Sequence, residues 1–480
     1  MRARSTALLA AALIASTIAT STVATTAVAT SAGAAQAPAR AEPAEGVHLE
    51  GRLPSGASYV MDRPADWNGT VLLYSHGYRP TGTPNPAENA PSPEVHQKLL
   101  ADGYALIGSS YASTGWAVTD AVPGQLATLD LFTRRLGAAE RTLAWGESYG
   151  GLITTALAER HWARFDGTLS MCGLTHGGVA NWNNTLDTTF ALKTLLAPTV
   201  PIAGFRDRQA ALDAAATAKA ATAAAQNTPE GRARIALVAA LYNVPGHNDP
   251  AQPKPAPTDW DAQQANQYAG VQGLISTSGF SWRQEAEARA GGNPSWNTGV
   301  DHAAMLARSP HFKEVGALYK KAGIRLGTDL AALDKAPRIT ADPSAAAWMR
   351  RTSTFTGRLV KPQLDIHTTG DGFVPVQVES GHLRAARGAG TSSRLLQQAY
   401  VDGPGHCTFT PGETLAALRT LEMRLDTGRW QNTPEVLNSL AAQADPTRPA
   451  RYARYRPAPY PRPYDRTNDR PYDGKRSNGA

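Results

Sequence analysis

Residues 141–158 read RTLAWGESYGGLITTALA: an apolar, strand-like run enters the pentapeptide Gly146-Glu-Ser-Tyr-Gly150, and a helical pattern of small residues leaves it. This is the G-x-S-x-G pattern of a nucleophile elbow, which holds its central serine, here Ser148, clear of the backbone. The turn is so sharp that only glycine fits at its flanks, and the serine is strained. A pattern this short can occur by chance, so the prediction depends on its position between a strand and a helix.

Strands and helices alternate on both sides of this segment. We expect strands at residues 46–52, 57–61, 70–75, 104–109, 142–145 and 166–171, and helices at residues 93–102, 125–136 and 151–163. Such alternation favours a mostly parallel sheet with right-handed crossovers.

The alternation stops at residues 175–360, which are Ala-rich and helical in pattern. Strand patterns return at residues 362–367 and 395–401, and helices at 411–427 and 433–442 close the fold. An insertion at this point is typical of a lid over an active site. A separate domain is the alternative, and the returning strands argue against it. The predicted core is therefore divided into residues 46–174 and 361–445.

The first 34 residues have the pattern of a secretory signal peptide. A basic start precedes an apolar run over residues 7–29, and Ala32-Gly-Ala34 offers a small-residue cleavage site. A membrane anchor is the alternative, although Ser and Thr interrupt the run. The sequence predicts a secreted, extracellular protein without a transmembrane segment in its mature form.

The formal net charge of +7 is concentrated at the chain ends. Residues 446–480 hold nine Lys or Arg and three Asp, and two more Arg lie in the first four residues. The remainder is nearly neutral, so no nucleic-acid surface is expected. The Pro/Arg/Tyr-rich tail, residues 446–480, is predicted to be disordered and to solubilise the chain, or to touch an anionic cell surface weakly.

A serine nucleophile needs a histidine base that a carboxylate orients. Asp371 lies in a glycine-flanked loop after the strand at 362–367, and His406 follows a Gly-Pro-Gly turn after the strand at 395–401. The rivals are less well placed, because two lie within a strand, one within a helix and one at a turn beside His406: Asp365, His367, His382 and Asp402. His76 is more typical of a structural or oxyanion-loop residue.

These motifs resemble the α/β-hydrolase superfamily, in its secreted, lid-bearing bacterial branch, over residues 46–442. The resemblance implies a mostly parallel central sheet with a large helical lid inserted after the strand that follows the nucleophile helix. It also implies that Ser148 is the nucleophile, Asp371 the acid and His406 the base. The oxyanion hole would use the backbone N–H group of Tyr149 and that of Gly77 or Tyr78.

Cys172 and Cys407, the two cysteines, follow strands whose ends reach the same rim of such a sheet. A disulfide between them would pin the histidine loop in an oxidising compartment, and two buried free thiols are the alternative. Tannase- and feruloyl-esterase-like enzymes are similar in linking a cysteine after the histidine to the nucleophile region. This chain departs from them because Glu147, rather than cysteine, precedes Ser148.

Gly-Glu-Ser-Tyr also resembles secreted serine carboxypeptidases, in which the glutamate helps to bind a substrate carboxyl group. Glu147 could equally be packed beneath the elbow. Trp116 and Trp182 follow strands and are candidates for the pocket wall or for ordinary loop packing. The common metal and phosphate motifs are missing from the sequence, so we expect no cofactor and no metal.

The sequence thus predicts a hydrolase that cleaves carboxylic esters in small molecules or short peptides through an acyl-enzyme. An exopeptidase or amidase is the alternative, because the same triad serves either bond. A binding protein that kept the fold would be expected to lack a triad member.

Overall fold

The computed structural model describes residues 46–462 apart from residue 393. The predicted signal peptide and the last 18 residues of the tail, 463–480, lie outside the described residues. The strands are β1 Val47–Arg52, β2 Ser58–Arg63, β3 Thr70–Ser75, β4 Ala105–Ser109, β5 Arg141–Glu147, β6 Gly167–Met171, β7 Gln363–Gly370, β8 Leu396–Pro404 and β9 Tyr452–Ala453.

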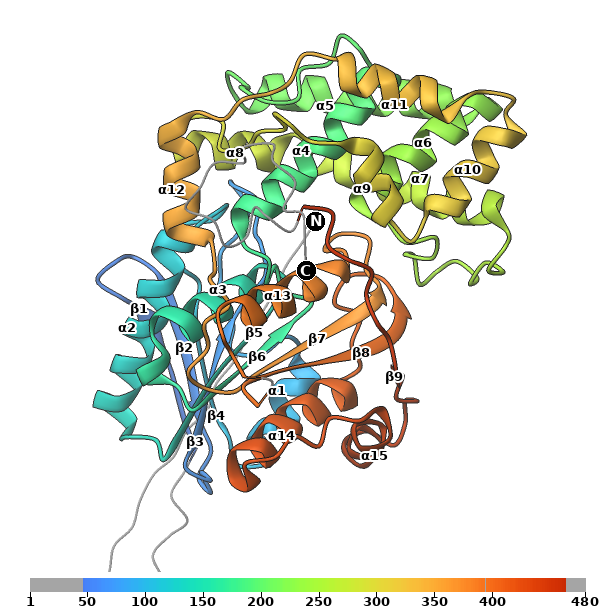
Figure 1. The fold of residues 1–480 in the computed structure, drawn as a ribbon. Coiled ribbons are helices and arrows are strands. Elements are labelled where there is room, and N and C mark those ends of the chain that lie inside the picture. Colours follow the sequence, from blue (N-terminus) through green and yellow to red (C-terminus); the bar gives the residue numbers. More distant parts are fainter. Residues whose placement is uncertain (1–45, 393, 463–480) are drawn as a thin grey trace, which may run out of the picture. The chain divides into compact units, whose positions relative to one another are not determined.

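The strands form one sheet in the order β1-β2-β4-β3-β5-β6-β7-β8-β9 (Figure 1). From β4 to β8 all neighbours are parallel, whereas β1, β2 and β9 pair in antiparallel fashion. The chain has the α/β-hydrolase fold. Its parallel strands all end at one edge, where the loops that carry chemistry gather.

Helices on both faces cover the sheet, and β3 shows why. Val71 and Leu73 pack into one core with α2 (Val118–Leu136) and α3 (Tyr149–Arg160), whereas Leu72 and Tyr74 pack into another. The second core includes α1 (Pro93–Ala101), α14 (Pro411–Thr427) and α15 (Pro434–Ala444). A strand buried on both faces alternates in this way because successive side chains point to opposite faces.

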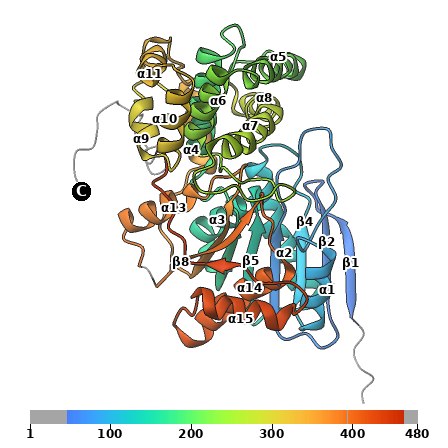
Figure 2. The ribbon, with the colours of Figure 1, turned by 90° about the vertical axis from the view of Figure 1, so that its right-hand side faces the viewer.

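Between β6 and β7 the described chain is helical, as predicted. The helices are α4 Gly178–Leu195, α5 Arg208–Gln226, α6 Pro229–Tyr242, α7 Trp260–Ser276, α8 Ser281–Ala290, α9 His302–Arg308, α10 Phe312–Lys321, α11 Leu326–Lys335 and α12 Pro343–Ser353. Figure 2 shows α5 to α11 gathered as one group, and they share an apolar core with α4. None of the helices within residues 46–462 combines the length and the apolarity that a bilayer span requires.

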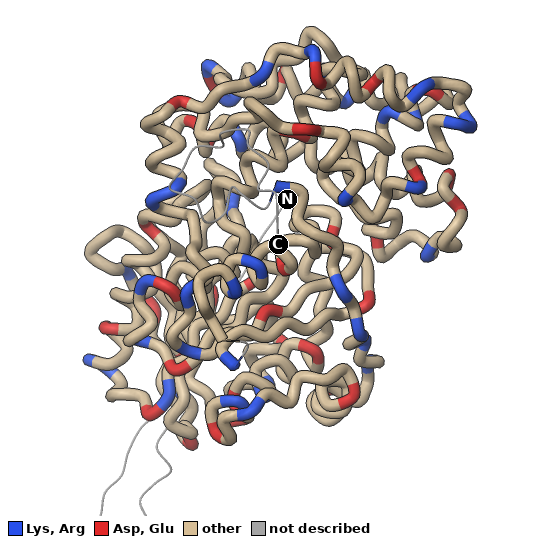
Figure 3. The backbone as a smooth tube through the Cα atoms, in the orientation of Figure 1, with Lys and Arg blue, Asp and Glu red and all other residues tan. Residues whose placement is uncertain are grey.

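The prediction of a disordered tail is wrong for residues 446–462. β9 pairs with β8, and the Tyr460 side chain is buried and donates a hydrogen bond to the Ala180 carbonyl. Arg462 is buried as well and forms a 3.1 Å ion pair with Asp187 of α4. The tail lacks a periodic apolar pattern, so these individual contacts could not be read from its composition. Figure 3 shows Lys and Arg interspersed with Asp and Glu along the described chain.

Candidate active site

The elbow forms as its sequence predicts. β5 runs into Ser148, whose φ of 56° and ψ of −122° lie outside the usual helix and strand regions, and α3 begins at the next residue. A Cβ atom on Gly146 would lie 2.6 Å from the Ser75 carbonyl oxygen, and one on Gly150 would collide with that same atom. Glycine is therefore required on both sides of the serine, whose strain the packed sheet holds in place.

Ser148, His406 and Asp371 lie in one hydrogen-bonded line. The Ser148 hydroxyl donates to Nε2 of His406 over 2.7 Å, and Nδ1 of His406 donates to Oδ2 of Asp371 over 2.6 Å. These contacts join the ends of β5, β7 and β8. A nucleophile, a base and an orienting acid within hydrogen-bond reach form the geometry of a catalytic triad.

The Asp371 carboxylate is fully buried and held from two sides. Its Oδ1 accepts from the backbone N–H groups of Phe373 and Val374 at 2.8 and 2.9 Å. Burial raises the pKa of Asp371, but the charges and hydrogen bonds of His406 and His367 outweigh burial and lower that pKa to about 2. The group is therefore a carboxylate at neutral pH, as an orienting acid must be.

The rival residues lie elsewhere. Asp402 is on the surface, where it contacts Lys254 and Thr369. Asp365 is buried in β7 and bonds to His382 of α13 (Gln377–Gly388), as its position within a strand had suggested. His367 is the exception, since its Nε2 lies 3.4 Å from Oδ2 of Asp371.

The backbone around Ser148 offers donors for an oxyanion. Tyr149 is the first residue of α3, where an N–H group has no acceptor within the helix. Gly77 passes close to the serine, since a Cβ on Gly77 would lie 3.7 Å from Cβ of Ser148. His76 fixes this loop: burial lowers its pKa to about 4, and a neutral imidazole donates one proton, which we assign to the 2.7 Å contact with the Gly77 carbonyl.

A cavity of about 500 Å³ opens beside Ser148 and is largely aromatic. Its wall includes the side chains of Tyr78, Trp116, Tyr149, Trp182, Tyr242, Trp282 and Phe373. The predicted Trp116 and Trp182 are both in this wall, with ring centroids 5.2 Å apart. Aromatic walls of this kind bind planar, apolar groups.

Three of the wall residues escaped the sequence analysis. Tyr242 ends α6 and Trp282 lies in α8, so the helical insertion supplies part of the pocket. Phe373 comes from the Asp371 loop, and its ring lies 5.8 Å from that of His406. The position of Phe373, two residues after Asp371, indicates a place near the active site. Nothing in the sequence indicates this for Tyr242 and Trp282, because only tertiary packing brings α6 and α8 to the elbow.

Glu147 also lines the cavity, where its side chain is partly buried. Burial raises the pKa of Glu147 to about 7, against the opposing influence of His406 and of a hydrogen bond with Tyr74. Near neutral pH this side chain is thus partly protonated and can donate as well as accept a hydrogen bond. Its location is compatible with both roles considered for it, substrate contact and packing below the elbow.

Cys172 and Cys407 form a disulfide, with Cα atoms 5.5 Å apart. Cys172 directly follows β6, next to the strand that carries Ser148, and Cys407 directly follows His406. The bond thus ties the loop that carries His406 to the neighbourhood of Ser148. It also closes a loop of 235 residues, which restricts the unfolded chain.

We expect removal of this bond in the double variant Cys172→Ala/Cys407→Ala to lower the free energy of unfolding by about 2–4 kcal/mol. The kcat should fall too, because His406 loses its adjacent anchor. Urea unfolding followed by tryptophan fluorescence measures the first effect, and ester hydrolysis measures the second. Unchanged unfolding in the double variant would show that the bridge contributes nothing to stability.

Two groups of side chains within the described residues have ligand atoms near enough for a metal ion. One comprises His406 and the two cysteines, whose sulfur atoms are bonded to each other. The other comprises Asp365, Glu379 and His382 of β7 and α13, which hydrogen bond among themselves and with neighbouring side chains.

No protein-family model matches the chain. An o-phthalyl amidase of Xanthobacter agilis is 29% identical over 429 residues, which cover 84% of this chain and 92% of the amidase. Feruloyl esterase B from Aspergillus oryzae aligns over 80% of this chain and 81% of its own, with 13% identity and a TM-score of 0.39. An acylaminoacyl peptidase of Pyrococcus horikoshii aligns over 80% of this chain but 42% of its own, with 11% identity and a TM-score of 0.34.

These names describe an amidase, an esterase and a peptidase, which are all hydrolases. The particular resemblances to tannases and to serine carboxypeptidases stay predictions.

Proposed function

We propose that this chain is a secreted serine hydrolase that cleaves carboxylic esters through an acyl-enzyme on Ser148. The contact that carries the proposal is the 2.7 Å hydrogen bond from the Ser148 hydroxyl to His406, which Asp371 orients from behind. The hydrolase character of the relative supports it. Export is supported by the pattern of the first 34 residues and by the disulfide.

The reaction follows from the geometry. His406 takes the proton of the Ser148 hydroxyl as the oxygen attacks the substrate carbonyl, and the resulting oxyanion accepts hydrogen bonds from backbone N–H groups at Tyr149 and the Gly77 loop. His406 then protonates the leaving alcohol. Water, deprotonated by the same imidazole, attacks the acyl-enzyme and releases the acid and free Ser148.

An amidase is the second candidate, because the alignment with the o-phthalyl amidase covers 84% of this chain and 92% of the amidase. The same imidazole can protonate a leaving amine. For either bond, the aromatic wall favours an aromatic acyl group. Apart from tyrosines and His406, Glu147 is the ionisable side chain in the described cavity wall. With no cation in that wall, an acyl group without a charged substituent fits better than an acyl group that carries a negative charge.

Matched p-nitrophenyl benzoate, p-nitrophenyl butyrate and N-benzoyl-p-nitroanilide separate these possibilities. We expect the benzoate ester to have the highest kcat/KM, with slower but measurable cleavage of the anilide. Equal or better turnover of the anilide would favour the amidase. Preference for butyrate would contradict the aromatic acyl group, and hydrolysis of none of the three by purified enzyme would count against the function itself.

A further inference from the structure

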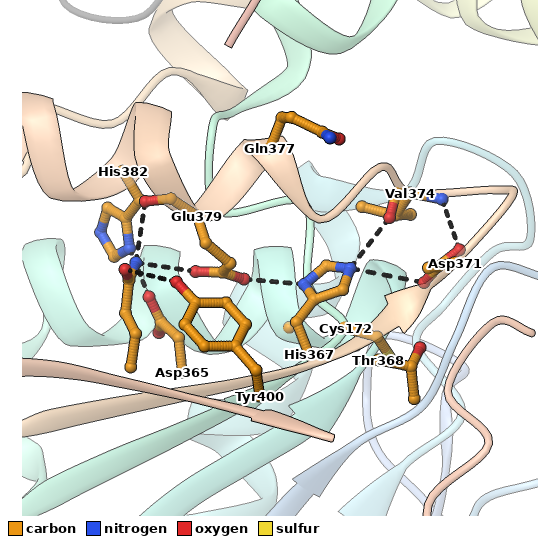
Figure 4. Close-up of polar contacts among 12 residues, drawn as sticks. Cys172, Asp365, His367, Thr368, Asp371, Val374, Gln377, Glu379, His382 and Tyr400 are labelled. Atoms are coloured by element: carbon orange, nitrogen blue, oxygen red, sulfur yellow. Dashed lines mark hydrogen bonds and ion pairs between the residues drawn. The ribbon is translucent and has the colours of Figure 1, made fainter. Parts of the chain in front are cut away.

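Strand β7 and helix α13 enclose a cluster of ionisable groups that hydrolysis as described does not use. Asp365 and His367 lie two apart on β7, and Glu379 and His382 lie three apart on the facing helix. None of the four is more than 1% exposed. Figure 4 shows them as two pairs, with His367 2.8 Å from Glu379 and His382 2.7 Å from Asp365. Burying so many ionisable groups is costly, which suggests a role beyond packing.

His367 connects this cluster to the triad. Its Nδ1 contacts Oε1 of Glu379, and its Nε2 lies 2.9 Å from the Val374 carbonyl oxygen and 3.4 Å from Oδ2 of Asp371. A carbonyl oxygen can only accept, so Nε2 must carry a proton. Figure 4 shows the contact of His367 with Asp371. Oδ2 of Asp371 is the atom that also accepts from His406, so two imidazoles face one carboxylate oxygen.

The charges agree with this geometry. Burial lowers the pKa of His367, but hydrogen bonds and charges of Asp371 and Glu379 outweigh it and raise that pKa to about 10. Burial raises the pKa of Glu379, whose Oε2 accepts a hydrogen bond from Gln398 of β8. The ionisable groups around His367 and Asp371 are Glu379, Asp365, His382, Tyr400, Tyr242 and His406. A cationic His367 is thus compensated by the carboxylates beside it.

We propose that His367, braced by Glu379, is a positioning residue that holds the Asp371 carboxylate and its loop in line with His406. The inference rests on the proposed function, since it concerns the acid of the same triad. Its basis is the shared contact of His367 with the Asp371 carboxylate and the Val374 carbonyl. Val374 also donates its N–H to Asp371, so His367 fixes both the side chain and the loop that surrounds it.

The test compares His367→Gln with His382→Gln. Both histidines are fully buried and bond to a carboxylate, but His382 bonds to Asp365, near the opposite end of β7 from Asp371. Active sites are counted by complete fluorophosphonate labelling, and kcat is expressed per labelled site. In His367→Gln we expect kcat to fall roughly 10–100-fold with KM within twofold of wild type, because small displacements of a reacting group cost rates of this order.

The pH profile gives a readout that loss of folding alone would not change. The acid limb of kcat/KM reports protonation of the free enzyme's base. Loss of a positive charge beside Asp371 favours proton uptake at the active site, so the limb should move to higher pH in His367→Gln and stay in place in His382→Gln. An unmoved limb, a kcat within twofold of wild type, or equal kcat losses in both variants would overturn the proposal.

The double variant His367→Gln/Glu379→Gln covers the case in which the single variant does not fold, because it replaces both members of the pair with neutral amides. It should show the same loss of kcat and a shift of the limb in the same direction, smaller because the negative charge of Glu379 is lost as well, and normal values for both would overturn the proposal. If wild-type enzyme is not labelled at Ser148, the proposed function fails instead. Failure of the proposed function is therefore seen in the wild type, whereas failure of the His367 proposal is seen in the variants.

Discussion

Replacing Ser148 with alanine is expected to lower kcat for p-nitrophenyl benzoate by about 10⁶-fold and to abolish fluorophosphonate labelling. The hydroxyl is the group that His406 can deprotonate over 2.7 Å, and alanine leaves that imidazole without a nucleophile to activate. The backbone donors near Tyr149 and Gly77 remain. Slow hydrolysis should therefore persist, at a rate about 10³–10⁴-fold above that of the uncatalysed reaction.

Ser276→Ala is a suitable control, because this serine is exposed on α7 and bonds to the Gln272 carbonyl of its own helix. It should label and turn over like the wild type. Labelling that persists in Ser148→Ala, with the adduct mapped to another residue, would refute Ser148 as the nucleophile. Circular dichroism of both variants checks that neither substitution alters the fold.

The elbow and the order of its partners could be predicted because their signals are local. Ser148 lies between glycines that the Ser75 carbonyl makes obligatory, and Asp371 and His406 each follow a strand in a turn rich in glycine. Parallel strands bring such turns to one edge of the sheet, and there the structure places all three. Physical constraint and sequence pattern coincide at these positions.

Other features depend on contacts between distant segments. Helix α2 begins at Val118, seven residues before the predicted start, although Pro123 and Gly124 usually end helices. Burial of its first turns, including Val118 and Ala121, offsets the hydrogen bond that proline removes. The same limitation applies to the tail, which is fixed by single residues such as Arg462 rather than by a repeating pattern.

The ionisable cluster on β7 and α13 could have been predicted from the spacing of its residues. A position inside β7 argues against a catalytic role for His367. Yet Asp365 and His367 share one face of a strand, and Glu379 and His382 share one face of the next helix. Ionisable residues at matched spacing on two consecutive buried elements indicate a paired cluster. Only the structure shows that one pair reaches Asp371.

Asp371→Asn should lower kcat about 10⁴-fold while leaving KM nearly unchanged. Oδ1 of Asp371 accepts from two backbone N–H groups, so the asparagine oxygen should keep that place and turn its NH₂ group toward Nδ1 of His406. An NH₂ group can only donate, which forces Nδ1 to be the acceptor and puts the imidazole proton on Nε2. His406 would then point a proton at Ser148 and could not accept one.

Asp402→Asn is the matched control for this prediction, since Asp402 is the rival carboxylate nearest to His406 in sequence and contacts Lys254 and Thr369 on the surface. Steady-state hydrolysis of p-nitrophenyl benzoate by both variants measures the difference. Asp402→Asn should retain wild-type kcat. A large loss of kcat in Asp402→Asn together with an active Asp371→Asn would contradict this prediction and assign the role of the acid to Asp402. We expect the opposite result, because two backbone N–H groups hold Oδ1 of Asp371 and leave its Oδ2 facing Nδ1 of His406.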